Sequence, residues 1–187
     1  MTTTDKLTLG QFLALPDTEP ASEFACGEVM QKPMPGGVHA FIQGYLFMVL
    51  FQFLTPARLG RVGTEWRCIF GPTGRERVFV PDVAVVLETR PPRDPSEYRG
   101  TYAGAPDAAV EVMSPDQPAA QFGDKLQFYL LHGVRLVWVI DPDARTARVF
   151  RPGEDAQLLT VDDILDGGDL LPGFRVALAD VFAQIPE

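Results

Sequence analysis

The sequence has few of the residues on which several common site chemistries depend. Its 187 residues include two cysteines and two histidines, and the cysteines form neither a CxxC pair nor any other metal-ligand spacing. This scarcity argues against a disulfide-stapled scaffold, and we expect Cys26 and Cys68 to be buried free thiols in a reducing compartment. The sequence also lacks a glycine-rich phosphate loop and a G-x-S-x-G nucleophile elbow.

Positive charge is scarce as well. The chain has 16 Lys and Arg residues against 25 Asp and Glu residues, which gives a net charge of −9. Because phosphate contacts need basic side chains, this balance argues against avid nonspecific binding to nucleic acid, although it permits a local basic cleft. The sequence starts without a signal-peptide pattern, and its apolar-rich segment 40–54 is shorter than the ~18–20 residues of a membrane span. We therefore expect a cytoplasmic protein with no membrane partner.

Apolar residues, in contrast, are plentiful. They make up 46% of the chain and include 13 Phe residues, which at this length suits a single domain over residues 1–187 with a sizeable core. Periodicity predicts helices at 7–15, 38–54, a segment ending at Gly133, and 179–184, and strands at 61–70, 78–87, 108–113, 136–140 and 146–150. A hairpin should turn near Gly27. The pattern predicts an α/β (α+β) fold with a mixed β-sheet flanked by helices.

Two acidic residues lie inside apolar runs that are typical of buried strands. Asp82 lies in the run 78–86, and Glu111 lies in the run 108–113. An ionised carboxylate in such surroundings costs several kcal/mol unless a cation, a metal or strong hydrogen bonds compensate it. A shared divalent ion would satisfy both residues, and hard oxygen ligands favour Mg²⁺ or Mn²⁺. Without a metal, we expect their proximity to raise the pKa of the pair.

Each carboxylate also has a structural explanation. Asp82 can cap backbone donors where Pro81 bends the chain at the start of a strand, but the apolar run continues beyond it and places it within the strand. Glu111 can pair with an arginine in the core; strand alternation puts it on one face with the small Ala109 and with Met113. That small neighbour leaves room for a ligand.

The other candidate residues are basic or lie in a turn. Lys125 falls beside the apolar stripe of the helix that follows Glu111, so it leans toward the sheet, either as a site residue or as a snorkelling lysine. His39 begins the long helix and can reach a cleft, whereas His132 ends a helix and suits a structural role. Glu28, in the first hairpin, is an auxiliary carboxylate or an exposed charge. Phosphate contacts in this acidic protein can come from a long loop that contains Arg90, Arg93 and Arg99.

Together these motifs resemble the Uma-two family of restriction-endonuclease-like proteins, a branch of the PD-(D/E)XK nuclease superfamily. The resemblance covers most of the chain, in the segments 23–29, 80–85, 109–115, 124–129, 133–142 and 171–174. It implies a restriction-endonuclease-like fold in which Asp82 and Glu111 bind metal and Glu28 assists them. The superfamily pattern expects a lysine at the position of Met113; in this family it is shifted to the following helix, here to Lys125.

The leading hypothesis is thus a Mg²⁺-dependent endonuclease that hydrolyses DNA. Asp82, Glu111 and Lys125 would be catalytic, with Glu28 and His39 auxiliary. A nuclease fold that has lost its activity and serves binding or regulation is the alternative, and a metal-independent carboxylate pair is a third. The helix 38–54 is apolar on more than one side, so we also expect a homodimer unless the segment 170–185 covers the second side.

Overall fold

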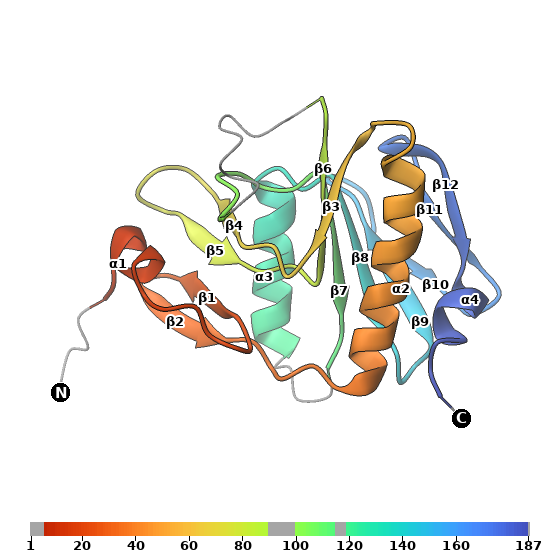
Figure 1. The fold of residues 1–187 in the computed structure, drawn as a ribbon, viewed down its shortest axis with the longest axis horizontal. Helices are drawn as coiled ribbons and strands as arrows, with labels where there is room; N and C mark the ends of the chain where they lie inside the picture. The colour runs from red at the N-terminus through yellow and green to blue at the C-terminus, as the bar shows by residue number, and fades with distance from the viewer. Residues whose placement is uncertain (1–5, 90–99, 115–118, 187) are drawn as a thin grey trace.

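A six-stranded mixed β-sheet lies at the centre of the part of the chain that the structure describes, residues 6–89, 100–114 and 119–186 (Figure 1). In this computed structural model the strand order is β10-β9-β8-β7-β6-β3. The strands are β3 (Gly60–Thr64), β6 (Val83–Leu87), β7 (Ala108–Val112), β8 (Leu136–Asp141), β9 (Thr146–Phe150) and β10 (Gln157–Leu159). β7 and β8 run parallel and are connected through α3 (Ala119–Leu131), while the other neighbours are antiparallel. The predicted mixed sheet is confirmed.

Helices cover both faces of this sheet, as the sequence predicted. The α2 helix (Gly37–Leu54) packs on one face through Ile42, Leu46 and Leu50, and α3 packs on the other through Tyr129 (Figure 1). A C-terminal unit joins the layer of α2; it consists of β11 (Ile164–Gly167), β12 (Leu171–Ala177) and α4 (Leu178–Phe182). The β11–β12 hairpin was not expected, because its strands are short and carry Gly and Asp residues.

A second, four-stranded sheet lies beside the first and has the order β2-β1-β5-β4. It contains β1 (Ser22–Ala25), β2 (Glu28–Gln31), β4 (Cys68–Phe70) and β5 (Arg77–Phe79). The short helix α1 (Leu9–Leu13) packs against it, with the rings of Phe12 and Phe24 stacked at 5.1 Å, and Thr8 caps α1. The predicted hairpin turns at Cys26 and Gly27, both with positive φ, which leaves Cys26 exposed rather than buried.

The chain passes from one sheet to the other at two places where the sequence predicted a single continuous strand. The run 61–70 forms β3 in one sheet and β4 in the other, and the run 78–87 likewise divides into β5 and β6. Pro81 lies at the second division because it has no N–H to donate to a ladder. Asp82 therefore precedes β6 instead of lying within a strand. This correction places Asp82 at the junction of the two sheets.

Among the described residues, α2 is the one helix that is long and apolar enough to cross a membrane. Length and composition are weak grounds for a span, because the core helix of a globular protein passes the same test. One side of α2 packs on the central sheet through fully buried leucines, which is the position of a core helix. Its other side retains exposed apolar residues, namely Phe41, Met48 and Phe51.

The burial of α2 predicts a clear contrast between two leucine substitutions. Leu50 is fully buried, whereas Leu131, at the end of α3, is 72% exposed. Leu50→Ala should lower the free energy of unfolding by about 2–5 kcal/mol through lost burial and a residual cavity. Leu131→Ala should change it by less than about 0.5 kcal/mol. Urea unfolding monitored by circular dichroism measures both, and similar losses would contradict this assignment of the core face.

Candidate active site

The pairing of β6 with β7 brings the two predicted carboxylates together. Their antiparallel register joins Val83 to Val110, so that Asp82, one residue before β6, comes opposite Glu111. The main-chain N–H of Val112 donates to Asp82 Oδ2 at 2.7 Å, which holds the residue to the end of β7. Both side chains are buried, at 1% and 4% exposure. The predicted juxtaposition of two buried carboxylates is thus present in the structure.

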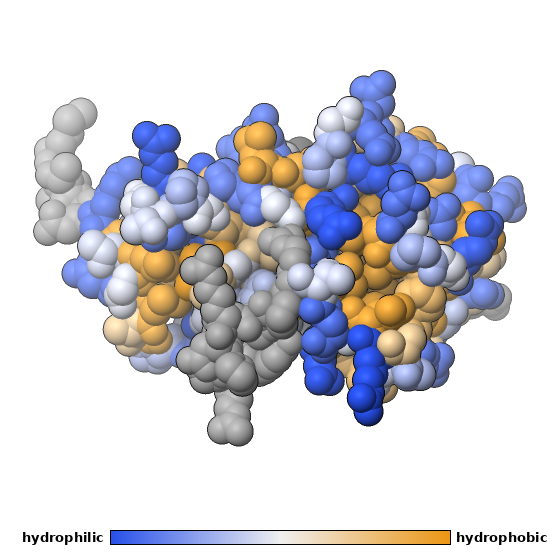
Figure 2. All heavy atoms as spheres, turned by 90° about the horizontal axis from the view of Figure 1, so that it is seen from above, coloured by the Kyte–Doolittle hydropathy of each residue, from blue (hydrophilic) through white to orange (hydrophobic). Residues whose placement is uncertain are grey.

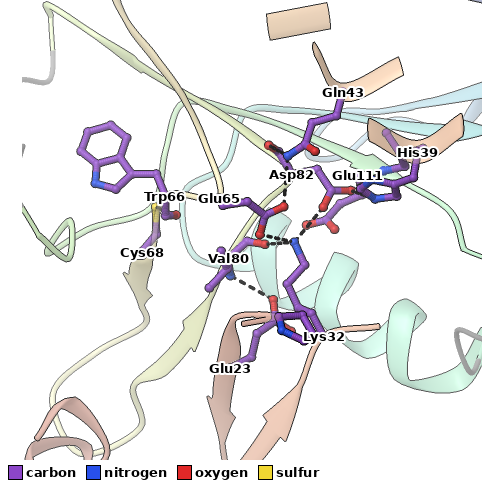
Figure 3. A network of polar contacts seen from close by, with 12 residues as sticks. Glu23, Lys32, His39, Gln43, Glu65, Trp66, Cys68, Val80, Asp82 and Glu111 are labelled. Carbon is purple, nitrogen blue, oxygen red and sulfur yellow. Dashed lines mark hydrogen bonds and ion pairs between the residues drawn. The ribbon is translucent and has the colours of Figure 1, made fainter. Parts of the chain in front are cut away.

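Asp82 is surrounded by donors. Lys32 Nζ donates to its Oδ1 at 2.7 Å, and His39 Nε2 lies 3.1 Å from its Oδ2 (Figure 3). Burial alone would raise the pKa of Asp82, but the hydrogen bond from His39 and the charge of Lys32 outweigh it and lower the pKa well below its usual range. Asp82 is therefore ionised at neutral pH.

Glu111 has a different electrostatic setting. Tyr129 Oη donates to its Oε1 at 2.8 Å, and Lys125 Nζ donates to its Oε2 at 3.0 Å. Burial raises the pKa of Glu111 to about 7, with a further contribution from the charge of Asp82, although Lys125 opposes the shift. The two carboxylates therefore titrate apart, and the expectation of a raised pKa holds for Glu111 but is wrong for Asp82. The reason is that Asp82 alone contacts His39 and Lys32.

Lys125 joins α3 to both sheets. Its Nζ donates to Glu23 of β1 at 2.9 Å as well as to Glu111 of β7. Burial lowers the pKa of a lysine, but the charges of Glu111 and Glu23 outweigh it here and raise the pKa of Lys125. The prediction that Lys125 faces the sheet is confirmed, and its ammonium remains charged beside Glu111.

Glu23 occupies the place that the sequence analysis assigned to Glu28. Glu23 is buried and accepts from Lys125 and from the N–H of Val80 at 2.9 Å, whereas Glu28 is exposed at the start of β2 and does not line the cavity described below. β1 is an inner strand between β2 and β5, while β2 is at the edge of its sheet. Which carboxylate points inward depends on this pairing, which the hairpin sequence does not reveal.

Two further residues of the site were not predicted from the sequence. Lys32 follows β2, and Glu65 follows β3 with a left-handed φ of 49°. Lys32 bridges Glu65 and Asp82, and Gln43 of α2 donates to Glu65 at 3.0 Å (Figure 3). Lys32 and Glu65 lie just beyond the ends of strands. At such positions the alternation of apolar and polar residues no longer predicts to which side of the sheet a side chain points. The sequence did indicate that the buried Asp82 needs a cationic partner. It did not indicate that Lys32 is that partner.

The predicted residue His132 lies apart from this cluster. His132 ends α3, where its Nδ1 lies 2.9 Å from the carbonyl oxygen of Phe128 and its ring stacks on the Phe128 ring, in keeping with a structural role. Arg90, Arg93 and Arg99 fall outside the described residues, so their proposed phosphate contacts stay a prediction.

The site residues line a cavity of about 1140 Å³ between the two sheets. Its described lining contains more acidic than basic side chains: Asp17, Glu19, Glu23, Glu65, Asp82 and Glu111 against Lys32, Arg67 and Lys125. Carboxylate oxygens of this kind suit Mg²⁺ or Mn²⁺. Among the described residues, however, no three His, Cys, Asp or Glu side chains are grouped to hold a metal ion. An ion here would therefore take two carboxylates and complete its shell with carbonyl oxygens and water, as Mg²⁺ commonly does.

Comparison with known proteins agrees with this geometry. The family model of Uma2, described as "Putative restriction endonuclease", matches residues 9–179, which include every residue of the cluster. The chain belongs to the Uma2 family. No curated protein matches it.

A solved structure shares the Uma2 fold seen here. It is the crystal structure of "a putative nuclease belonging to DUF820" from Anabaena variabilis ATCC 29413, which is 34% identical to this chain. The match covers 95% of this chain and 98% of that chain, with a TM-score of 0.85. The restriction-endonuclease-like α+β architecture is therefore established.

The raised pKa of Glu111 predicts a pH-dependent stability in the metal-free protein. Its pKa rises from the usual 4.5 to about 7 in the folded protein, so the fold favours the protonated form. The stability that Glu111 contributes is present below pH 4.5 and is lost as the pH rises toward 7. Glu111→Gln should remove this loss.

Urea unfolding of wild type and Glu111→Gln from pH 4.5 to 8, in EDTA, measures the effect. The difference in unfolding free energy between the two proteins should shift in favour of the variant as the pH rises. Glu28→Gln, which makes the same substitution at an exposed position of the first hairpin, is the matched control. A pH-independent difference for Glu111→Gln would contradict the assigned pKa.

Proposed function

We propose that this protein is a Mg²⁺- or Mn²⁺-dependent endonuclease that hydrolyses phosphodiester bonds in DNA. The observation that carries the proposal is the convergence of Asp82, Glu111 and Lys125 in one cavity of an Uma2-family fold. The family description and the nuclease similar in structure support DNA as the substrate. The charge, burial and contacts of these three residues support the role that we propose for each.

Asp82 and Glu111 are the residues that would hold the metal. A bound divalent ion polarises the scissile phosphate and lowers the pKa of a coordinated water. Asp82 is kept ionised by Lys32 and His39, so it offers a negative charge to a cation at neutral pH. The Val112 N–H and His39 both contact Oδ2 of Asp82, which restrains the carboxylate in one orientation.

Lys125 would act beside Glu111 as a fixed positive charge. Its ammonium lies 2.9 Å from Oε1 and 3.0 Å from Oε2 of Glu111, within a buried site. A pre-oriented charge in such surroundings stabilises negative charge that develops in a transition state. Glu23 and Tyr129 hold the pair in place, because Glu23 accepts from Lys125 and Tyr129 donates to Glu111. His39 is auxiliary through its contact with Asp82.

A second candidate function is binding or regulation without cleavage. Protein donors contact all four carboxylate oxygens of Asp82 and Glu111, as expected of an ion-pair network that stabilises a fold. The net charge of −9 also disfavours close approach of a nucleic acid. Loss of activity under all conditions would favour this function.

A homodimer is also proposed, with α2 as its interface. Phe41, Met48 and Phe51 leave apolar surface in water, and such patches often mark an interface. Figure 2 shows apolar side chains gathered on the half of the molecule that contains α2 and the C-terminal elements. Those C-terminal elements cover part of α2, since Phe174 contacts Phe53 edge-on at 5.4 Å. They leave the three exposed residues free for a second chain.

Cleavage should require both the metal and the charged cluster. We expect wild type to cleave plasmid or single-stranded DNA with Mg²⁺ or Mn²⁺, and EDTA to abolish cleavage. Glu111→Ala and Lys125→Met should each lower the rate about a hundredfold or more, because each removes fixed charge from the site. Glu28→Ala, at an exposed position, should leave the rate unchanged. Cleavage that survives Glu111→Ala would reveal a contaminant or another site, whereas inactivity on every substrate would favour the binding protein.

The dimer predicts a solution mass twice that of one chain. Light scattering at micromolar concentration measures it, and Phe51→Glu should shift the mass toward one chain because it puts a charge into the apolar interface. Leu131→Glu places the same charge on α3, at a residue that is 72% exposed, and should not change the mass. A wild-type mass of one chain would contradict the dimer.

A further inference from the structure

A lysine ammonium fills a position where three oxygen atoms of the cavity converge. Lys32 Nζ donates to Glu65 Oε2 at 2.8 Å, to the carbonyl of Val80 at 2.8 Å and to Asp82 Oδ1 at 2.7 Å (Figure 3). An ammonium has three N–H donors, so these contacts use all of them. The side chain is 12% exposed. Lys32 therefore contributes a charge and has no donor left for a substrate.

Glu65 and Asp82, which supply two of these oxygens, are also restrained through their other oxygen atoms by contacts that do not involve Lys32. Gln43 donates to Glu65 Oε1 at 3.0 Å and to the carbonyl of Asp82 at 2.8 Å, and Val112 donates to Asp82. Glu65 has a left-handed backbone, a costly conformation for a residue other than glycine and one that is concentrated at functional sites. Two of the three residues around the ammonium are thus positioned by contacts of their own, and the lysine lies between them.

The chemistry of this group is that of a divalent-cation site. Two carboxylates and a backbone carbonyl are hard oxygen donors, which Mg²⁺ and Mn²⁺ prefer. The Lys32 side chain donates to three oxygen acceptors, two of which belong to carboxylates, and such contacts favour the charged form of a lysine. Lys32 is therefore an ammonium at neutral pH. It supplies permanently the positive charge that an ion would supply at this position.

We propose that Lys32 is a built-in cation that takes the place of a divalent ion beside Asp82 and Glu65. Many phosphodiesterase sites hold two metal ions. In this protein the cavity would bind one, at Asp82 and Glu111, with Lys32 as the second positive charge. The inference rests on the proposed function only for the ion at Asp82 and Glu111. The role of Lys32 as a substitute for a second ion does not depend on any activity.

Removal of the lysine should create a new metal site. Calorimetric titration of Mn²⁺ should show one more bound ion per chain in Lys32→Met than in wild type. Without Mn²⁺ the variant should be less stable than wild type, since Asp82 and Glu65 lose their cation. Added Mn²⁺ should raise its Tm by more than it raises that of wild type, because the additional ion binds only the folded state.

Two further variants test whether the additional Mn²⁺ binds at the position of Lys32 or is attracted simply by the loss of a positive charge from the cavity. Arg67→Met removes the same charge from the same cavity, at a residue that pairs with Asp17 instead of Asp82. It should bind the same number of ions as wild type. The double variant Lys32→Met/Glu65→Gln removes one of the converging carboxylates and should lose the additional ion.

Lys32→Gln, which loses the charge but keeps a polar group, is titrated in parallel in case Lys32→Met does not fold. The absence of an additional ion in both variants overturns the proposal, as does an equal gain in Arg67→Met. If wild type binds no Mn²⁺ and Lys32→Met binds one, the inference about Lys32 is supported and the proposed metal-dependent function is contradicted.

Discussion

The ion pair of Lys125 with Glu23 and Glu111 is the interaction on which the arrangement of the site depends. It links β1 of the small sheet, β7 of the central sheet and the helix α3 through one buried ammonium. Removal of one partner from such a group leaves an uncompensated buried charge, which typically costs about 3–5 kcal/mol. The sheets therefore cannot separate at this point without a large penalty. Glu23, Glu111 and Lys125 all line the cavity, so this ion pair holds one part of its wall together.

Lys32 makes a second connection of the same kind. It comes from the end of β2 and contacts oxygens at the end of β3 and at the crossing between β5 and β6. The two lysines thus alternate with the carboxylates Glu23, Glu111, Asp82 and Glu65 across the junction of the sheets. Each ammonium lies between two carboxylates, so the buried carboxylates Glu23, Asp82 and Glu111 each have a cationic partner, while Glu65 is exposed.

This alternation also separates the properties of the two central carboxylates. Asp82 contacts Lys32, His39 and the N–H of Val112 and has a lowered pKa, whereas the pKa of Glu111 is raised by burial. Environments that separate the pKa values of paired groups are typical of functional sites, although ion-pair networks in a stable core can do the same. The same contacts of Asp82 and Glu111 can therefore serve stability or activity. Measurements of metal binding and of DNA cleavage distinguish a functional site from a purely structural ion-pair network.

The sequence by itself determined the main helices, most of the central strands and the two central acids. The apolar periodicity of α2 and the near-continuous run of β8 predicted a helix and a strand, because burial leaves a regular pattern along the chain. Asp82 and Glu111 were identifiable because charged residues inside apolar runs demand compensation, and Lys125 because it flanks an apolar stripe. Only the tertiary structure decided the rest. The division of 78–87 between two sheets, the choice of Glu23 over Glu28, and the entry of Lys32 and Glu65 all depend on strand pairing between distant segments. Pairing partners leave no periodic signal in a single sequence, so no local pattern could have shown that Glu23, Lys32 and Glu65 join Asp82 and Glu111.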